Sequence, residues 1–308
     1  MGRATAVYAA AAVLFSLLVA TPAAALAADS PPMSRPTTAD QPEIATTTGW
    51  YAPERSSSIT LYKPTGDGPF PAVVFLHGGA WGRSQPNAYE LQWARDLATQ
   101  QHWLVAVIGY PTRVPHEHVA EPRAIDFAIN ALARRSDVDP NAIALWGESA
   151  GGQLALLAAY RDAARLHPVI GGVVSISGPT DMRREYSSLA QTALGAVTRF
   201  EGLSPRAARR AKSARYRTTS PVHLVRRGDP ATFQAISRHD RLVPPGQVDR
   251  LTRLLARVHV MHRTVRLPGN AHSTGLETQR PPGAEHTVAE LAVRFLERAF
   301  AARRVSFS

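Results

Sequence analysis

The pentapeptide Gly147-Glu148-Ser149-Ala150-Gly151 is the stretch most able to present a nucleophile. An apolar run, 143–146, predicts a buried strand before it, and small apolar residues from Leu154 predict a helix after it. A G-x-S-x-G pattern indicates a nucleophilic serine when a strand precedes it and a helix follows it. The glycines permit the tight turn that exposes the serine, and the helix N-terminus favours negative charge beside it. We therefore expect Ser149 to act as a nucleophile.

A serine hydroxyl needs a base, and the base needs a carboxylate to orient it. After this kind of turn the partners follow in the order acid, then histidine. Asp240 follows a predicted strand at 232–236, and His272 follows another at 264–267. Alone, Asp240 also suits a turn or a helix cap, and His272 a surface histidine. Together with Ser149 they predict a Ser-His-Asp triad.

The loop from His77 to Trp81 follows a fully apolar strand, 72–76. Acyl transfer passes through an oxyanion that backbone amides stabilise. Glycines leave such amides unobstructed, so we expect the N–H of Gly78 or Gly79 to act together with that of Ala150, while His77 and Trp81 support the loop. The alternative is an ordinary glycine turn with a packed tryptophan.

Strand and helix patterns alternate along the chain, which predicts an α/β fold with a mostly parallel, doubly wound sheet and helices on both faces. A long irregular connection, 178–225, leaves room for one or two short helices. The other predicted strands are 59–62, placed at an edge of the sheet, 104–108 and 169–177, and the other helices are 88–100, 124–135, 247–257 and 286–301.

With these motifs the chain resembles the α/β-hydrolases of the secreted esterase and lipase type that carry a His-Gly-Gly-x-Trp loop, a group that includes feruloyl-esterase-like and kynurenine-formamidase-like enzymes. The similarity extends from about Thr60 to about Arg298. The similarity also rests on the segments Tyr62-Lys63-Pro64, Ser220-Pro221, Val243-Pro244 and Gly269 to His272.

The resemblance implies an α/β-hydrolase fold with Ser149 as nucleophile, His272 as base and Asp240 as its orienter. It implies no metal and no organic cofactor. Ala80 stands where the hormone-sensitive-lipase-like group has a third glycine, and the segment 108–111 lacks the Tyr-Arg pair common in such esterases.

The pattern of the N-terminal residues predicts that the protein is exported. Residues 1–28 combine Arg3, an apolar stretch at 7–20 and a small-x-small site at 25–27, which is typical of a cleavable signal peptide. The Pro- and Thr-rich residues 29–48 predict a flexible linker, and 49–308 the catalytic domain.

The 308 residues carry a formal net charge of +11 and no cysteine, which excludes disulfides, cysteine-ligated zinc, thiol catalysis and a lipobox anchor. Because the basic residues are spread along the chain, we expect no nucleic-acid partner. The arginine-rich segment 199–227 is either a solvated helical face or a weak contact with an anionic cell-envelope surface.

We therefore expect a secreted serine hydrolase that cleaves small carboxylic esters through an acyl-enzyme. An amidase, formamidase or peptidase could use the same machinery. A non-catalytic binding protein could keep the fold, although binding alone has no need of Ser149, Asp240 and His272 together.

Overall fold

The computed structural model describes residues 44–51, 57–114, 117–161, 170–182, 196–197, 200–202 and 214–307. The predicted signal peptide and the linker up to residue 43 lie outside them. Among the described residues, no helix combines the length and the apolar character needed to cross a membrane.

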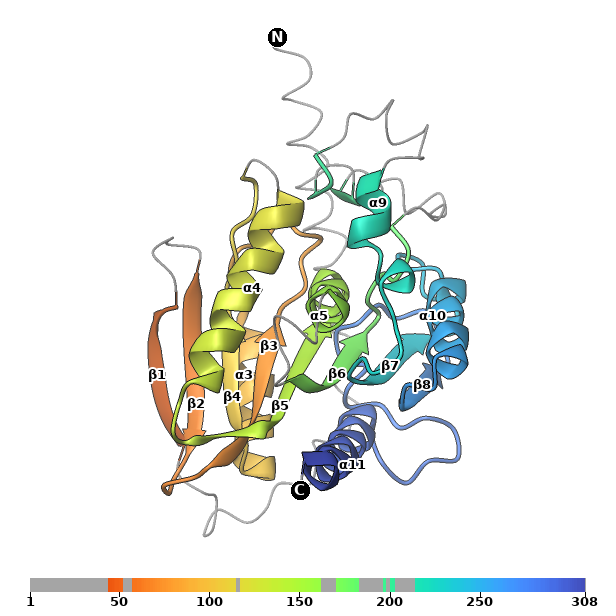
Figure 1. The fold of residues 1–308 in the computed structure, drawn as a ribbon. Coiled ribbons are helices and arrows are strands. Elements are labelled where there is room, and N and C mark those ends of the chain that lie inside the picture. Colours follow the sequence, from red (N-terminus) through yellow and green to blue (C-terminus); the bar gives the residue numbers. More distant parts are fainter. Residues whose placement is uncertain are drawn as a thin grey trace. The chain divides into compact units, whose positions relative to one another are not determined.

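One eight-stranded sheet organises these residues, in the order β1-β2-β4-β3-β5-β6-β7-β8 (Figure 1). Strands β3 to β8 run parallel to one another, whereas β1 and β2 are antiparallel additions. The strands are β1 Ile44–Trp50, β2 Ser58–Pro64, β3 Phe70–Leu76, β4 Leu104–Ile108, β5 Val138–Glu148, β6 Ile170–Ile176, β7 Ala231–Ser237 and β8 His262–Leu267. The helices are α3 Ala88–Gln101, α4 Glu117–Ala133, α5 Ala150–Tyr160, α9 Ala214–Thr219, η2 Pro221–His223, α10 Pro245–Arg257 and α11 Val288–Phe307.

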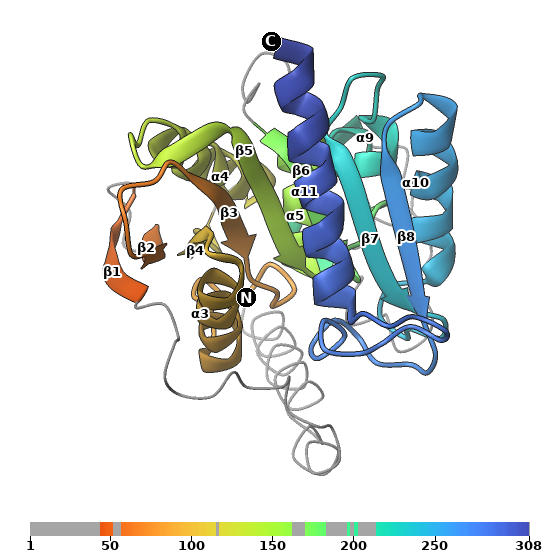
Figure 2. The same cartoon turned by 90° about the horizontal axis from the view of Figure 1, so that it is seen from below.

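Helices cover both faces of the sheet, as the sequence predicts. Alternate residues of β3 divide between two cores, because successive side chains of a strand point to opposite faces. Val74 and Leu76 pack with α4, α5 and α10, whereas Val73 and Phe75 pack with α3 and α11. Figure 2 shows α3 and α11 together on one side of the sheet. The central strands are therefore buried on both faces, which explains their continuous apolar runs.

The position of one strand in the sheet and the start of the domain differ from the prediction. The strand at 59–62 is not at an edge, because β1 pairs along its outer side from Ile44↔Pro64 to Trp50↔Ser58. The expected domain boundary at Gly49 therefore lies inside β1. The residues 45–48 of β1 are all exposed, so no apolar alternation marked this strand in the sequence.

Helix α4 begins at Glu117, well before the predicted start at residue 124, and Pro122 lies inside it. Pro122 is past the first turn, so its missing N–H removes one hydrogen bond that would otherwise go to the carbonyl of residue 118. The apolar inner face of the helix, which includes Pro122, Ile125 and Ile129, is buried, and this packing stabilises the helix on both sides of the proline.

Of the long connection, the structure describes residues 178–182, 196–197, 200–202 and 214–225, and the last of these stretches contains α9 and η2. Residues 199 and 203–213 of the arginine-rich segment 199–227 lie outside the described residues, so its expected contact with an anionic surface stays a prediction.

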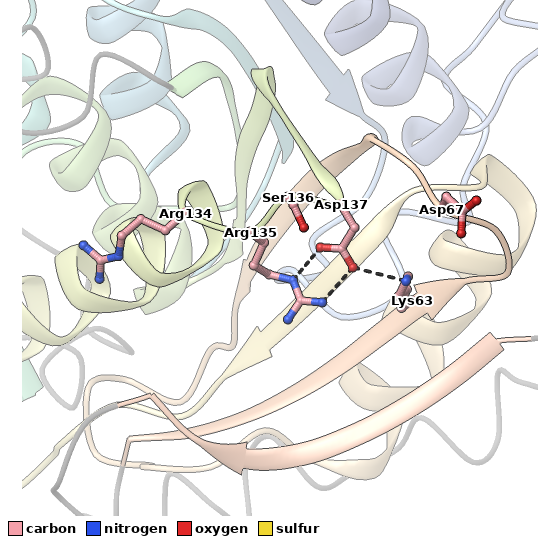
Figure 3. Close-up of a pocket in the computed structure, with 6 residues that line it drawn as sticks. All are labelled: Lys63, Asp67, Arg134, Arg135, Ser136 and Asp137. Atoms are coloured by element: carbon pink, nitrogen blue, oxygen red, sulfur yellow. Dashed lines mark hydrogen bonds and ion pairs between the residues drawn. The ribbon is translucent and has the colours of Figure 1, made fainter.

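A polar hollow of about 500 Å³ lies at the amino ends of β3 and β5, the end of the sheet opposite Ser149. Its centre is Asp137, which binds Lys63 at 3.2 Å and Arg135 at 2.7 Å (Figure 3). The hydrogen bond from Arg135, with the charge of Lys63, lowers the pKa of Asp137.

We predict that Asp137→Asn lowers the free energy of unfolding at neutral pH by less than about 1 kcal/mol, because both partners are partly exposed. A lowered folded-state pKa contributes stability above the unfolded pKa and loses it as the pH falls. The difference between parent and variant in urea denaturation should thus shrink below about pH 4. A difference that is the same at every pH would contradict this assignment.

Candidate active site

Ser149 occupies a strained turn between β5 and α5. Its φ of 51° and ψ of −118° lie in a region that non-glycine residues rarely adopt. The Ser149 N–H donates to the carbonyl of Ile176 at 2.8 Å. A Cβ on Gly151 would lie 2.1 Å from the carbonyl oxygen of Leu76, and one on Gly147 would lie 2.2 Å from that of Gly151. Only glycine fits at these two positions, so the close approach of strand, helix and loop fixes the turn.

The structure brings the three predicted triad residues together at the carboxyl ends of β5, β7 and β8. His272 Nε2 lies 2.8 Å from Ser149 Oγ, and His272 Nδ1 lies 2.8 Å from Asp240 Oδ2. The three groups thus form one continuous hydrogen-bonded chain, although 123 residues separate Ser149 from His272.

The carboxylate of Asp240 is fully buried and held by its own turn. Its Oδ1 accepts the N–H groups of Leu242 and Val243, each at 2.9 Å. The side chain is 0% exposed, while that of His272 is 16% exposed. A carboxylate fixed in this way orients the imidazole with Nδ1–H toward Asp240, which leaves Nε2 as the acceptor for the serine proton.

The structure removes one of the predicted oxyanion donors in the loop from His77 to Trp81. The N–H of Gly78 donates to Glu90 Oε1 at 3.1 Å, so it is already engaged and leaves the candidate donors. Gly79, with a φ of +122°, and Ala150 remain. Ala150 is the first residue of α5, so its N–H has no partner within the helix.

His77 and Trp81 both support this loop. His77 is fully buried, stacks on Tyr110 at a centroid distance of 4.2 Å, and donates from Nδ1 to the carbonyl of Gly78. Burial, and then the charge of Arg83, lowers the pKa of His77 to about 4, so it is neutral at physiological pH. Trp81 donates from its indole to Gln153 Oε1 at 3.0 Å.

Sequence reasoning missed the groups behind the loop. Glu90 accepts from Gly78 N–H, from Asn87 N–H and from both terminal nitrogens of Arg83, and Arg83 also donates to the Gly78 carbonyl. Asn87 and Glu90 form a capping box at the start of α3. The Asn-x-x-Glu spacing marks that helix start and could have identified Glu90. Nothing in the sequence links Tyr110 to the loop, yet its hydroxyl donates to the His77 carbonyl at 2.6 Å.

The described residues contain no group of three or more His, Cys, Asp or Glu side chains placed to hold a metal ion.

The model of the BD-FAE family matches residues 59–255. Among curated proteins, the chain is 30% identical over 149 residues to "Secreted lipase 5" of Gibberella zeae, covering 42% of this chain. It is 32% identical over 127 residues to an "Esterase" of Fusarium pseudograminearum, covering 37% of this chain. These alignments span only 26% and 37% of the relatives' lengths.

Solved structures show the same fold at low sequence identity. Esterase B of Lactobacillus rhamnosis aligns with a TM-score of 0.73 and 17% identity, covering 99% of each chain. A carbohydrate esterase from gut microbiota aligns with a TM-score of 0.68 and 18% identity, covering 86% of this chain and 99% of that one. The α/β-hydrolase fold predicted from the sequence is confirmed, as is the resemblance to proteins of the esterase and lipase type.

We predict that Glu90→Ala lowers the free energy of unfolding by about 2 to 3 kcal/mol, because it leaves the Gly78 N–H without its acceptor and Arg83 without its carboxylate partner. Glu297→Ala, an exposed site on α11, is the control and should change stability by less than about 0.5 kcal/mol. If chemical denaturation gave both variants the same small change, the support assigned to Glu90 would be wrong.

Proposed function

The chain belongs to the BD-FAE family, and we propose that it is a serine carboxylesterase that uses Ser149, His272 and Asp240 as its triad. The observation that carries the proposal is the hydrogen-bonded chain from Asp240 through His272 to Ser149. The names of the relatives, a secreted lipase and an esterase, agree with it.

In this mechanism Ser149 Oγ attacks the ester carbonyl while His272 Nε2 takes the hydroxyl proton. Asp240 keeps Nδ1–H in place and stabilises the imidazolium that forms. His272 then returns the proton to the alcohol oxygen as the C–O bond breaks, which leaves an acyl group on Ser149. A water molecule, deprotonated by His272, attacks this acyl-enzyme, and the proton passes back to Ser149 Oγ as the acid departs.

The negative oxygen of each tetrahedral intermediate would accept hydrogen bonds from the N–H groups of Gly79 and Ala150. Donors that are fixed before the reaction lower the barrier, because they need no reorganisation when the charge develops. The dipole of α5 adds to this effect, since its positive end lies beside Ser149.

We also propose that the protein is secreted. The predicted signal peptide at 1–28 supports this, as does the similarity to a protein named as a secreted lipase. The predicted substrate is a small-molecule ester.

We predict that the protein hydrolyses p-nitrophenyl esters and that Ser149→Ala lowers kcat/KM by at least about 10³-fold, because the nucleophile is removed. Assays from acetate to palmitate would also report the acyl length that the site accepts. Ser136→Ala, in the hollow at the opposite end of the sheet, is the matched control and should retain parent activity.

Equal activity of the parent and Ser149→Ala would refute the triad. An inert parent would refute ester hydrolysis, and amides, formamides and peptides would then be assayed before a binding role is considered.

We further predict that Gly79→Ala lowers kcat by about 10²-fold with a small effect on KM, as expected when an oxyanion donor is displaced. The substitution is strained at a φ of +122°, and its Cβ would meet Arg83 at 2.7 Å. Gly246→Ala, where a Cβ meets nothing within 4 Å, is the control. Parent-like kcat in a folded Gly79→Ala would exclude Gly79 as a donor.

A further inference from the structure

Two buried glutamates lie beside the nucleophile turn without an assigned role. Glu148, the last residue of β5, immediately precedes Ser149 and is 2% exposed, and Glu277 is 0% exposed. Glu148 Oε1 and both carboxyl oxygens of Glu277 are buried without a well-aligned hydrogen-bond donor. Buried oxygens of this kind are costly unless a donor satisfies them.

The two carboxyl groups interact with each other. Each lies within hydrogen-bonding reach of the other, and that contact affects both titrations. Burial, and then the charge of Glu277, raises the pKa of Glu148 well above its usual range. Burial also raises the pKa of Glu277. A carboxyl pair that holds one proton supplies the missing donor, because the protonated group donates to the ionised one.

The other groups that face the pair supply no donor to Glu148 Oε1. Glu90 adds a further negative charge, which raises the pKa of both carboxyls. Arg83 lowers the pKa of Glu148, but its guanidinium donates to Glu90 and to the Gly78 carbonyl. The Tyr89 phenol lies within hydrogen-bonding reach of Glu277 and is neutral, because burial, and then the charge of Glu277, raises its pKa.

Glu277 lies in the same connection as His272, between β8 and α11. Residues 268–271 of this loop are exposed, whereas Ser273, Leu276 and Glu277 are buried. The Ser273 N–H donates to Ser177 Oγ at 3.2 Å, and the Glu277 carbonyl accepts from Ala289 N–H at 2.9 Å. The side chain of Glu277 is thus placed to tie the histidine loop to the strand end that carries the nucleophile.

We propose that Glu148 and Glu277 are positioning residues that share one proton and thereby hold the His272 loop against the nucleophile turn, so that His272 Nε2 stays within reach of Ser149 Oγ. The catalytic part of this inference rests on the proposed esterase function. The shared proton does not depend on it.

The sign of the pH effect follows from the pair's chemistry. An unfolded glutamate loses its proton near about pH 4.3, whereas the folded pair retains one to higher pH. A raised folded-state pKa gives stability that is complete below the unfolded pKa and is lost as the pH rises through the folded value. Glutamine cannot ionise, but its amide still donates to the remaining carboxylate, so Glu148→Gln should abolish this loss.

The first experiment compares the melting temperatures of the parent, Glu148→Gln and Glu277→Gln between about pH 5 and about pH 9. We expect both glutamine variants to gain stability relative to the parent as the pH rises. Asp137→Asn is the control for removal of a carboxylate, and because the pKa of Asp137 is lowered it should leave the slope unchanged over this range. Parent-like slopes in both glutamine variants would overturn the shared proton.

The second experiment measures ester hydrolysis at neutral pH by the glutamine and alanine variants at both positions. The glutamine variants should retain kcat within about 3-fold, and the alanine variants should lose about 30- to 100-fold in kcat with KM within about 2-fold, because the histidine is misplaced. At alkaline pH the parent's kcat should fall where that of the glutamine variants does not.

Folded alanine variants with parent-like kcat would overturn the positioning role, as would glutamine variants as impaired as the alanine ones. If the alanine variants do not fold, the glutamine pH profiles decide. A parent without esterase activity would refute the proposed function and the positioning role together, while the melting temperatures would still decide whether the pair shares a proton.

Discussion

The site depends on a backbone contact so close that only glycine, which has no side chain, fits there. Strand β5, helix α5 and the loop after β3 meet at Gly151, where a Cβ would lie 2.1 Å from the Leu76 carbonyl oxygen. This close approach holds Ser149 at a φ of 51°. The pairing of Leu76 with Gly147 in the neighbouring strands fixes where the loop after β3 lies relative to the turn at Ser149. The surrounding cores stabilise a turn that local backbone preference opposes.

Polar groups gather at the carboxyl edge of a sheet whose two faces are apolar. Arg83 and Glu90 lie behind the oxyanion loop, and Glu148 and Glu277 lie beside the nucleophile turn. Buried charges add little to stability unless every partner is satisfied, so their value in such a place lies in fixing geometry. Glu90 is the clearest case, because it accepts the Gly78 N–H and thereby fixes the start of the loop from His77 to Trp81.

The central strands and the candidate triad could be predicted because their signals are local. Each strand is an apolar run, and Ser149, Asp240 and His272 each follow one in the expected order. Strand β1 could not be predicted, because the residues 45–48 are polar or small and exposed. The choice between Gly78 and Gly79 depends on a carboxylate from α3, and the role of Glu277 on a contact with β5, so neither is visible in the local sequence.

The most direct test of the account is covalent trapping of the nucleophile. The protein would be treated with a p-nitrophenyl phosphonate ester, which reacts with serines activated by a histidine base, and the labelled peptides identified by mass spectrometry. The account predicts one adduct, on Ser149, and its loss in a folded His272→Ala variant, because the base is then missing. A folded parent that stays unlabelled, or that is labelled at another serine, would contradict it.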